Sequence, residues 1–431
     1  MLMQKTLRSE IEKSILESSL NFAEFSRLSG LNRGIFSAVL NANPPKPISL
    51  NQLETIGKAL GQAPDWMFDY YVEECFYHGK PNRRRVEPFL IRCADLKRID
   101  LIEQVFSRLL EDLKYLDMIF EIGETLYLSD RKFEAIPFYE CVVHNERYHQ
   151  SERMAVSHYR LFCASISEEH EVNLRAIIRF EPYCENLPIH LRLAALMNLV
   201  DLYIALDKWN EVERNAQNLI TLSNTLYRMN RKNKELSLLE KPLVVYYGYG
   251  FLAMENVMIS YGEYEKAKIY LAGYEDLSWF QGMDDKAKAQ VVRFSIFAEQ
   301  NRNYLDLRLG DQMAVEKCMN FLELYPEDGL TALLTLLEIA NTNDYNINEA
   351  IELLLKKIEQ EPDPNYYQSK LIKSRYQLDI YYQKSIYYRR NKQYKKALKA
   401  ILKATELADE INSIDSRKVH GLLLSLLEQE T

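Results

Sequence analysis

The sequence predicts an all-α protein, with a small N-terminal domain followed by a long array of helical repeats. Three observations support this fold class. Gly and Pro are scarce, at 14 and 13 of 431 residues, while strong helix formers such as Leu, Lys and Glu are abundant. Residues 1–75 contain short apolar helical periods separated by capping residues, and a turn motif recurs along residues 99–431.

Charge is distributed unevenly along the chain. The net charge is -8, yet residues 1–98 carry 14 Lys and Arg against 11 Asp and Glu, a balance of +3, which leaves -11 for the remainder. A weakly basic N-terminal domain on an acidic body suits a protein in which that domain alone meets an anion.

The cysteines and the hydropathy indicate the compartment. The 6 cysteines are scattered and form no CxxC pair, which is typical of buried thiols in a reducing compartment. The first residues are polar and lack a signal peptide, and no apolar run reaches the ~18 residues that a membrane-spanning helix needs. We therefore expect a cytoplasmic protein without membrane attachment.

The first two helices of the N-terminal domain are predicted from spacing and caps. Leu7, Ile11 and Ile15 repeat every four residues and line one face of a first helix. Asn21 is placed to cap a second helix, with Glu24 three residues on completing a capping box. Gly30 then ends this helix.

Three further helices follow within the same domain. Asn32 caps a third helix over residues 33–41, whose apolar residues point inward. Ser49 and Gln52 form a capping box for a fourth helix, and Pro64 opens a fifth. The third helix leaves a row of polar side chains facing outward together: Asn32, Arg33, Ser37 and Asn41.

Two short helices joined by a glycine turn can present the second helix to the DNA major groove. We expect Arg33 to donate to guanine, Asn32 or Asn41 to contact adenine, and Ser37 to reach a base edge or a phosphate. Three further residues are expected to donate to phosphates: Asn21, Ser26 and Lys46. By spacing alone, a helical domain that binds protein, or nothing, is an equal alternative.

The sequence of this region resembles a known DNA-binding type. Residues 21–71 resemble the Cro/lambda-repressor type of helix-turn-helix, most clearly in the turn at residues 31–36 and the helix at residues 48–61. The resemblance implies binding to double-stranded DNA. Ala38 departs from the pattern, because many relatives carry a long polar residue there, so base readout is expected to rest on Arg33.

Residues 76–98 are predicted to be a linker. Gly79, Pro81 and Pro88 are expected to exclude a helix from this segment. It also carries three consecutive cations, Arg83, Arg84 and Arg85. They are expected either to contact phosphates beside the third helix or, as an equal alternative, to be solvated or paired with the acidic body.

Residues 99–431 are predicted to be tetratricopeptide-like repeats. An aromatic residue, two or three polar residues and a small residue recur where one helix gives way to the next, as in repeats with a period near ~34 residues. The instances are 131–135, 208–212, 262–267, 345–350 and 392–397. Gly123, twelve residues before Ala135, fits the small position of the preceding helix.

Stacked repeats of this kind form a superhelix whose concave wall binds extended peptides. Side chains with amide, carboxylate or hydroxyl groups satisfy the free backbone groups of such a peptide. The residues expected on this wall are Asn198, Asp201, Tyr249, Asn256, Arg293, Tyr382 and Arg389. For each of them a solvated helix face is the alternative.

The sequence contains no recognisable catalytic motif. Phosphate loops, nucleophile elbows, zinc-protease motifs and dinucleotide-binding turns are missing. His144, His149 and His158 come nearest to a metal cluster, but no paired Cys or carboxylate stands at metal-ligand spacing. We therefore expect a non-enzyme without a cofactor or a metal.

The whole arrangement resembles the peptide-pheromone receptors of Gram-positive bacteria and their phages, the Rap/Rgg/NprR/PlcR/PrgX family and the similar phage arbitrium receptors. This resemblance implies a homodimeric transcription regulator in quorum sensing, with two half-sites in its operator and a short signalling peptide on the concave wall. The alternative is a helical-repeat regulator that captures a protein partner without a peptide ligand.

Overall fold

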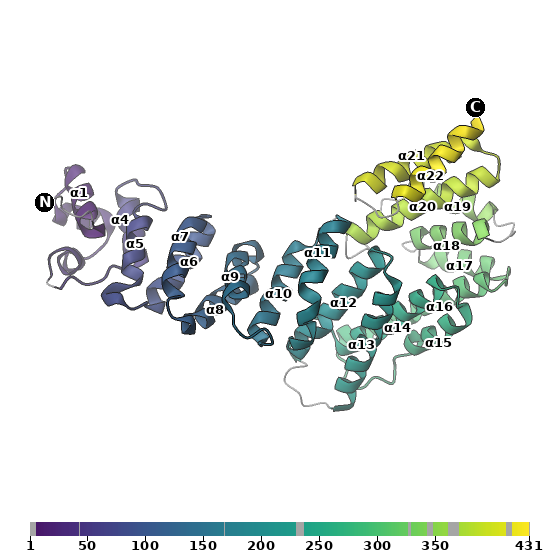
Figure 1. Ribbon diagram of the computed structural model, residues 1–431, viewed down its shortest axis with the longest axis horizontal. Coiled ribbons are helices and arrows are strands. Elements are labelled where there is room, and N and C mark those ends of the chain that lie inside the picture. Colours follow the sequence, from purple (N-terminus) through teal and green to yellow (C-terminus); the bar gives the residue numbers. More distant parts are fainter. Residues whose placement is uncertain are drawn as a thin grey trace. The chain divides into compact units, whose positions relative to one another are not determined.

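The computed structural model describes residues 6–42, 44–167, 169–229, 237–325, 329–342, 348–360, 370–410 and 416–430. Over these residues every regular element is a helix, as predicted (Figure 1). The chain divides into two compact units, Met1–Ala164 and Ser165–Thr431. No helix among the described residues is long and apolar enough to cross a bilayer.

The N-terminal part of the first unit contains the predicted short helices, namely α1 (Leu7–Glu17), α2 (Phe22–Ser29), α3 (Arg33–Phe36), α4 (Leu50–Ala59) and α5 (Phe68–Cys75). The predicted capping boxes are confirmed: the Asn21 side chain accepts from the backbone N–H of Glu24, and the Ser49 side chain from that of Gln52. These caps satisfy backbone donors that the first helical turn leaves without a partner.

Two of the predicted helix boundaries are wrong. The third helix does not continue regularly to residue 41, because α3 passes into a π-helical turn, η1 (Ser37–Asn41). The fifth helix does not begin at Pro64. Successive turns there end at Met67, whose φ of 63° lies in the left-handed region, and α5 starts at Phe68. Trp66 in this turn packs closely over Gly57, where an added Cβ would lie 3.2 Å from the indole.

The prediction that residues 76–98 exclude a helix is also wrong. Helix α6 (Arg83–Asp95) includes Pro88 in its interior. Pro88 has no backbone N–H, so the helix lacks one hydrogen bond. The helix forms nevertheless, because its apolar stripe is buried in the same core as α5. The ring centroid of Phe89 lies 5.3 Å from that of Phe68 and 5.1 Å from that of Tyr71. The boundary between the compact units falls after Ala164 and not in this segment.

The first unit continues with helices that pack in sequence. They are α7 (Ile99–Leu109), α8 (Leu116–Leu128), α9 (Lys132–Asn145) and α10 (Glu152–Ser165). Gly123 on α8 faces α9, and a Cβ there would lie 3.0 Å from Phe138. This close approach is the role expected of the small residue in a repeat.

The second unit is a stack of helices in which most consecutive members contact one another. The helices are α11 (His170–Phe180), α12 (Ile189–Ala205), α13 (Trp209–Met229), α14 (Leu243–Ser260), α15 (Tyr264–Glu275), α16 (Asp285–Arg308), α17 (Ala314–Leu324), α18 (Gly329–Thr342), α19 (Asn348–Gln360), α20 (Lys370–Arg390), α21 (Tyr394–Glu410) and α22 (Ser416–Glu430) (Figure 1). Helix α18 packs on α20 as well as on α19.

The predicted repeat turns fall between helices where they are described. The small residues Ala135, Val212, Ala267 and Ala397 are fully buried one turn into their helices. For the turn at 345–350, residues 345–347 lie outside the described residues; there Ala350 is half-buried and the neighbouring Ile351 is the buried residue.

One backbone cap recurs at these turns. The residue two positions after the end of the first helix has a positive φ, and the N–H of the following residue donates to the carbonyl five residues before it, as in a Schellman cap. Lys208 donates to Tyr203 at 2.9 Å and Gln393 to Tyr388 at 2.8 Å. Arg98 donates to Cys93 at 2.9 Å after Lys97 with a φ of 56°. The turn between α6 and α7 therefore has the geometry of the later repeat turns.

Candidate nucleic-acid interface and helical-repeat surfaces

The polar face of α2 and α3 carries most of the residues that we predicted to contact DNA. Gly30, with a φ of 69°, ends α2 and allows the chain to turn sharply into α3. Asn21, Asn32, Arg33 and Ser37 are all exposed. The Arg33 side chain forms no hydrogen bond or ion pair with any residue that the structure describes, so its guanidinium is available to an external acceptor.

The two asparagines are held by the caps that they form. Asn21 Oδ1 accepts from the backbone N–H of Ala23 at 2.9 Å and of Glu24 at 3.0 Å. Asn32 Oδ1 accepts from the N–H of Gly34 at 2.8 Å. In each case the amide oxygen serves the helix, and the Nδ2 group remains to donate outward.

The structure corrects the predicted phosphate role of Ser26 and leaves that of Asn41 open. The half-buried Ser26 hydroxyl donates to the Leu31 carbonyl at 2.5 Å, so its proton stabilises the turn between α2 and α3 and is not free for a phosphate. Asn41 ends η1, and its side chain lies outside the described residues.

Two carbonyls within η1 accept hydrogen bonds from outside it. The backbone N–H of Lys46 donates to the Ala38 carbonyl at 2.8 Å, and Arg8 Nε donates to the Val39 carbonyl at 3.0 Å. The loop after η1 is thereby folded back onto the helix, and the exposed Lys46 side chain belongs to this anchored loop.

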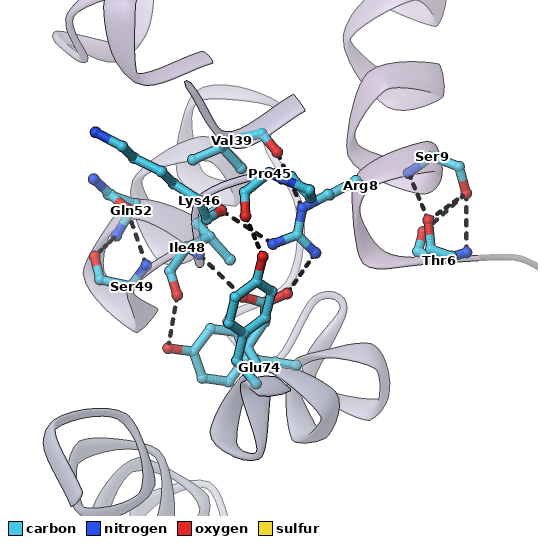
Figure 2. Close-up of polar contacts among 12 residues, drawn as sticks. Thr6, Arg8, Ser9, Val39, Pro45, Lys46, Ile48, Ser49, Gln52 and Glu74 are labelled. Atoms are coloured by element: carbon cyan, nitrogen blue, oxygen red, sulfur yellow. Dashed lines mark hydrogen bonds and ion pairs between the residues drawn. The ribbon is translucent and has the colours of Figure 1, made fainter. Parts of the chain in front are cut away.

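Arg8 and Glu74 form the anchor of this loop (Figure 2). Arg8 Nη1 lies 2.6 Å from Glu74 Oε1, and Arg8 Nη2 donates to the Lys46 carbonyl at 3.0 Å. Glu74 Oε2 accepts from the backbone N–H of Ile48 at 3.1 Å, and its side chain is only 3% exposed. Tyr77 adds a hydrogen bond to the Pro45 carbonyl.

Sequence analysis missed Arg8 and Glu74. The only local signal was that Arg8 directly follows Leu7, at the edge of the buried stripe of α1. Neither residue faces outward, so both act by positioning the polar face and do not contact DNA in our interpretation.

The three consecutive arginines have three different environments. Arg83 pairs with Glu87 at 2.8 Å and with Glu121 at 2.6 Å, and these hydrogen bonds raise its pKa. The Arg85 guanidinium is half-buried, 5.8 Å from the ring centroid of Tyr77. Arg83 is therefore paired within the protein, as in the predicted alternative, whereas Arg85 packs beside a ring without an ion pair to the described residues. Arg84 is exposed and forms no ion pair with the described residues.

In the second unit, two of the predicted peptide-binding residues contact each other. The Tyr249 hydroxyl on α14 donates to Asp201 Oδ1 on α12. Burial raises the pKa of Asp201 to about 6, and burial together with the Asp201 charge raises the pKa of Tyr249. The pair joins neighbouring repeats, and a ligand would have to compete for its polar atoms.

The remaining predicted wall residues are not gathered into one site by the contacts that the structure describes. Asn198 on α12 and Asn256 on α14 are half-buried. The Arg293 guanidinium lies 5.3 Å from the ring of Phe297, one turn along α16. Tyr382 and Arg389 on α20 face α22, where they meet Lys418 at 4.9 Å from the Tyr382 ring and Ser425 at 3.2 Å from Arg389 Nη1.

A link between α12 and α20 was also missed by sequence analysis. Arg375 on α20 lies 2.5 Å from Asp207, just after α12, and 3.0 Å from Asp379, one turn along its own helix. The pKa of Asp379 rises to about 6, because burial outweighs the favourable charge of Arg375. Asp207 and Arg375 are 168 residues apart, and no periodicity relates them.

Comparisons with known proteins add little. No protein-family model matches the chain, and no curated protein matches it. Among solved structures the chain is similar to a circular tandem repeat protein with novel repeat topology and enhanced subunit contact surfaces, at 12% identity and a TM-score of 0.19, over 98% of this chain and 87% of that one. A similarity at this TM-score carries no argument about function.

Proposed function

We propose that this protein is a homodimeric DNA-binding transcription regulator, gated by a short signalling peptide that the helical repeats bind. The observation that carries the proposal is the exposed polar face of α2 and α3, with Arg33 unpaired at its centre and the Arg8–Glu74 ion pair holding the loop behind it. The resemblance of residues 21–71 to the Cro/lambda-repressor type supports the same interpretation.

The chemistry of this face suits a DNA groove. Arg33 stands at the first position of α3, and the N-terminal residues of a recognition helix are those that reach base edges. An unpaired guanidinium donates two hydrogen bonds to guanine, worth about 1–3 kcal/mol of discrimination. The outward Nδ2 groups of Asn21 and Asn32 and the ammonium of Lys46 supply donors to phosphates and bases.

Affinity from a single domain is expected to be weak, which supports the dimer. Arg83 and Arg85 are engaged within the protein, so Arg84 and Lys46 remain as the predicted phosphate-binding cations that face outward. A domain that contacts few phosphates releases few counterions from the DNA, and therefore gains little affinity from their release. Two domains on one dimer would bind two half-sites about 34 Å apart, one helical turn of DNA.

In this proposal, binding of the peptide to the helical repeats changes the distance between the two DNA-binding domains of the dimer. A peptide shifts the equilibrium between two spacings only by as much as its affinity differs between them. Half-buried polar groups on α12 and α14, such as Asn198 and Asn256, supply amides for an extended peptide backbone.

The test is a gel mobility shift with the full-length protein and the DNA upstream of its own gene. We expect Arg33→Ala to weaken binding by about 5- to 150-fold, the equivalent of 1–3 kcal/mol. Lys58→Ala, which removes an exposed cation from α4 in the same domain, is the matched control and should change binding less than about threefold. Equal affinities for the wild type and Arg33→Ala would remove the recognition role of α3.

The peptide is tested separately in the same assay. Synthetic peptides covering the product of a short open reading frame beside the gene should change the affinity for DNA, and scrambled peptides should not. If DNA binding is intact and no such peptide alters it, the gate is removed and capture of a protein partner becomes the better account.

A further inference from the structure

A strongly basic segment lies in the acidic second unit. Residues 380–405 contain eight Lys and Arg and no Asp or Glu, in a chain whose net charge is -8. The segment covers the second half of α20 and most of α21. A cluster of cations of this size creates a stronger local positive potential than a single surface lysine creates.

This segment forms one side of a groove between α19, α20 and α21. The groove has a volume of about 900 Å³. Its lysines come from three helices: Lys396, Lys399 and Lys403 stand three and four residues apart on one face of α21, Lys384 stands on α20 and Lys356 on α19. Lys403 also pairs with Glu406 of its own helix at 2.5 Å. Helical spacing therefore arranges the cations in a row along the groove.

The floor of the groove is apolar. Tyr381 and Tyr388 from α20, with Leu353 and Leu355 from α19, line it beneath the lysines. Lys384 Nζ lies 5.5 Å from the ring centroid of Tyr381, and Lys396 Nζ lies 5.2 Å from that of Tyr388. The ammonium groups thus rest beside the rings and border an apolar strip; Leu353 is 47% exposed within it.

The α19 side of the groove carries both charges. Glu349 and Glu352 line the groove from α19, together with Lys356 of the same helix. The excess of lysines on α21 would draw the negative face of an occupant towards that helix.

We propose that this groove binds an acidic amphipathic helical segment of a protein partner. The apolar face of such a helix would cover the strip of Tyr and Leu side chains, and its carboxylates would pair with the lysine row. A nucleic acid backbone would use the lysines but leave the apolar floor uncovered, which is why a protein segment fits better.

The groove is separate from the surfaces of the proposed function. Tyr381, Lys384 and Tyr388 share one face of α20, whereas Tyr382 and Arg389 are rotated by about 100° from it and face α22. A partner in this groove is therefore a further function, independent of the DNA-binding face and of the predicted peptide wall.

The test uses the full-length protein and a labelled synthetic peptide of about 18 residues, long enough to form a helix. The peptide has Leu at helical spacing and Glu at the remaining positions; a second peptide of the same composition has the Leu residues scrambled. We expect the amphipathic peptide to bind, in fluorescence anisotropy, at least about tenfold more tightly than the scrambled one.

The triple variant K396E/K399E/K403E reverses the charge of three lysines that line the groove. The matched control, K317E/K395E/R417E, reverses the charge of three exposed cations that do not line the groove. The groove variant should lose about tenfold or more in affinity, and the control should change by less than about threefold. Circular dichroism checks that both remain folded.

Three results would overturn the proposal. They are equal binding of the two peptides, equal losses in the two triple variants, and displacement of the peptide by a duplex DNA that binds the groove more tightly. None of these results bears on the Arg33 experiment, so the proposal and the DNA-binding function can fail separately.

Discussion

Arg8 Nη1 lies 2.6 Å from Glu74 Oε1, and this ion pair joins the first helix of the chain to α5. Both partners also bond the backbone of the loop between η1 and α4, through the Lys46 carbonyl and the Ile48 N–H. The relationship matters for function because Arg8 also donates to the Val39 carbonyl of η1, so one ion pair joins η1, the following loop and α5.

Replacing Glu74 by Gln is expected to destabilise the first unit by about 3 kcal/mol, since a largely buried Arg8 guanidinium loses its charge partner. The matched control is Glu73→Gln. Glu73 pairs with Arg108 but is 75% exposed, and its replacement should cost less than about 1 kcal/mol. Urea unfolding measures both variants, and equal changes in the free energy of unfolding would contradict the positioning role of Glu74.

The arginine run is expected to contribute unequally to DNA binding. Arg84→Ala should reduce the slope of log affinity against log salt by about 0.9 for each phosphate that the Arg84 side chain neutralises. Arg83→Ala should leave the slope nearly unchanged, because Arg83 is already paired with Glu87 and Glu121. The measurement is a salt titration of DNA affinity. Equal changes in slope for the two variants would show that the ion pairs of Arg83 do not persist on DNA.

The link between α12 and α20 is expected to be energetically coupled. A double-mutant cycle with Asp207→Asn and Arg375→Gln should give a coupling energy of about 1 kcal/mol, because the Arg375 side chain is only 13% exposed. The comparison is Glu171→Gln with Arg175→Gln, an exposed pair on α11 that should couple by less than about 0.5 kcal/mol. A zero coupling for Asp207 and Arg375 would show that this ion pair does not stabilise the packing of α20 beside α12.

The stability of the second unit is expected to fall as the pH rises from about 4.5 to about 7. Glu255 is fully buried and accepts hydrogen bonds from Tyr274 and Asn301, yet burial still raises its pKa from 4.5 to about 7. The unfolded chain loses this proton first, so ionisation favours unfolding. The contribution is about 3 kcal/mol below pH 4.5 and is lost above pH 7.

Glu255→Gln should remove most of this pH dependence, because the amide does not ionise. Urea unfolding midpoints at several pH values between 4.5 and 8 give the two profiles. Asp201 and Asp379, whose pKa values are also raised to about 6, should keep a smaller slope of the same sign in the variant. Parallel profiles for the wild type and the variant would contradict the assignment to Glu255.

Two glycines of the second unit are expected to respond to alanine in opposite directions. At Gly250 on α14 an added Cβ would lie 2.7 Å from Ile220 of α13, so Gly250→Ala should destabilise by about 1–3 kcal/mol. At Gly421 on α22 nothing lies within 4 Å, and Gly421→Ala should stabilise by up to about 1 kcal/mol through helix propensity. Thermal unfolding tests both, and destabilisation by both would refute the packing argument.

Local sequence predicted most helix beginnings in the N-terminal domain and the buried positions of the repeats. The caps at Asn21, Asn32 and Ser49 depend on residues at most three positions apart, and the burial of Ala135 and Ala267 depends on a short turn motif. The errors came from contacts across the fold. Pro88 reads as a helix breaker, but packing of Phe89 against Phe68 and Tyr71 outweighs the one hydrogen bond that the proline cannot form.

The sequence by itself therefore determined that this is a helical protein, where many helices begin, and that Asn32, Arg33 and Ser37 face outward, because periodicity and capping are local. Tertiary structure alone decided that Arg8 meets Glu74, that Arg375 meets Asp207, and that Arg83 meets Glu121. A charged side chain takes the partner that the packing of apolar faces brings within reach, and that partner is not encoded by its neighbours in the chain.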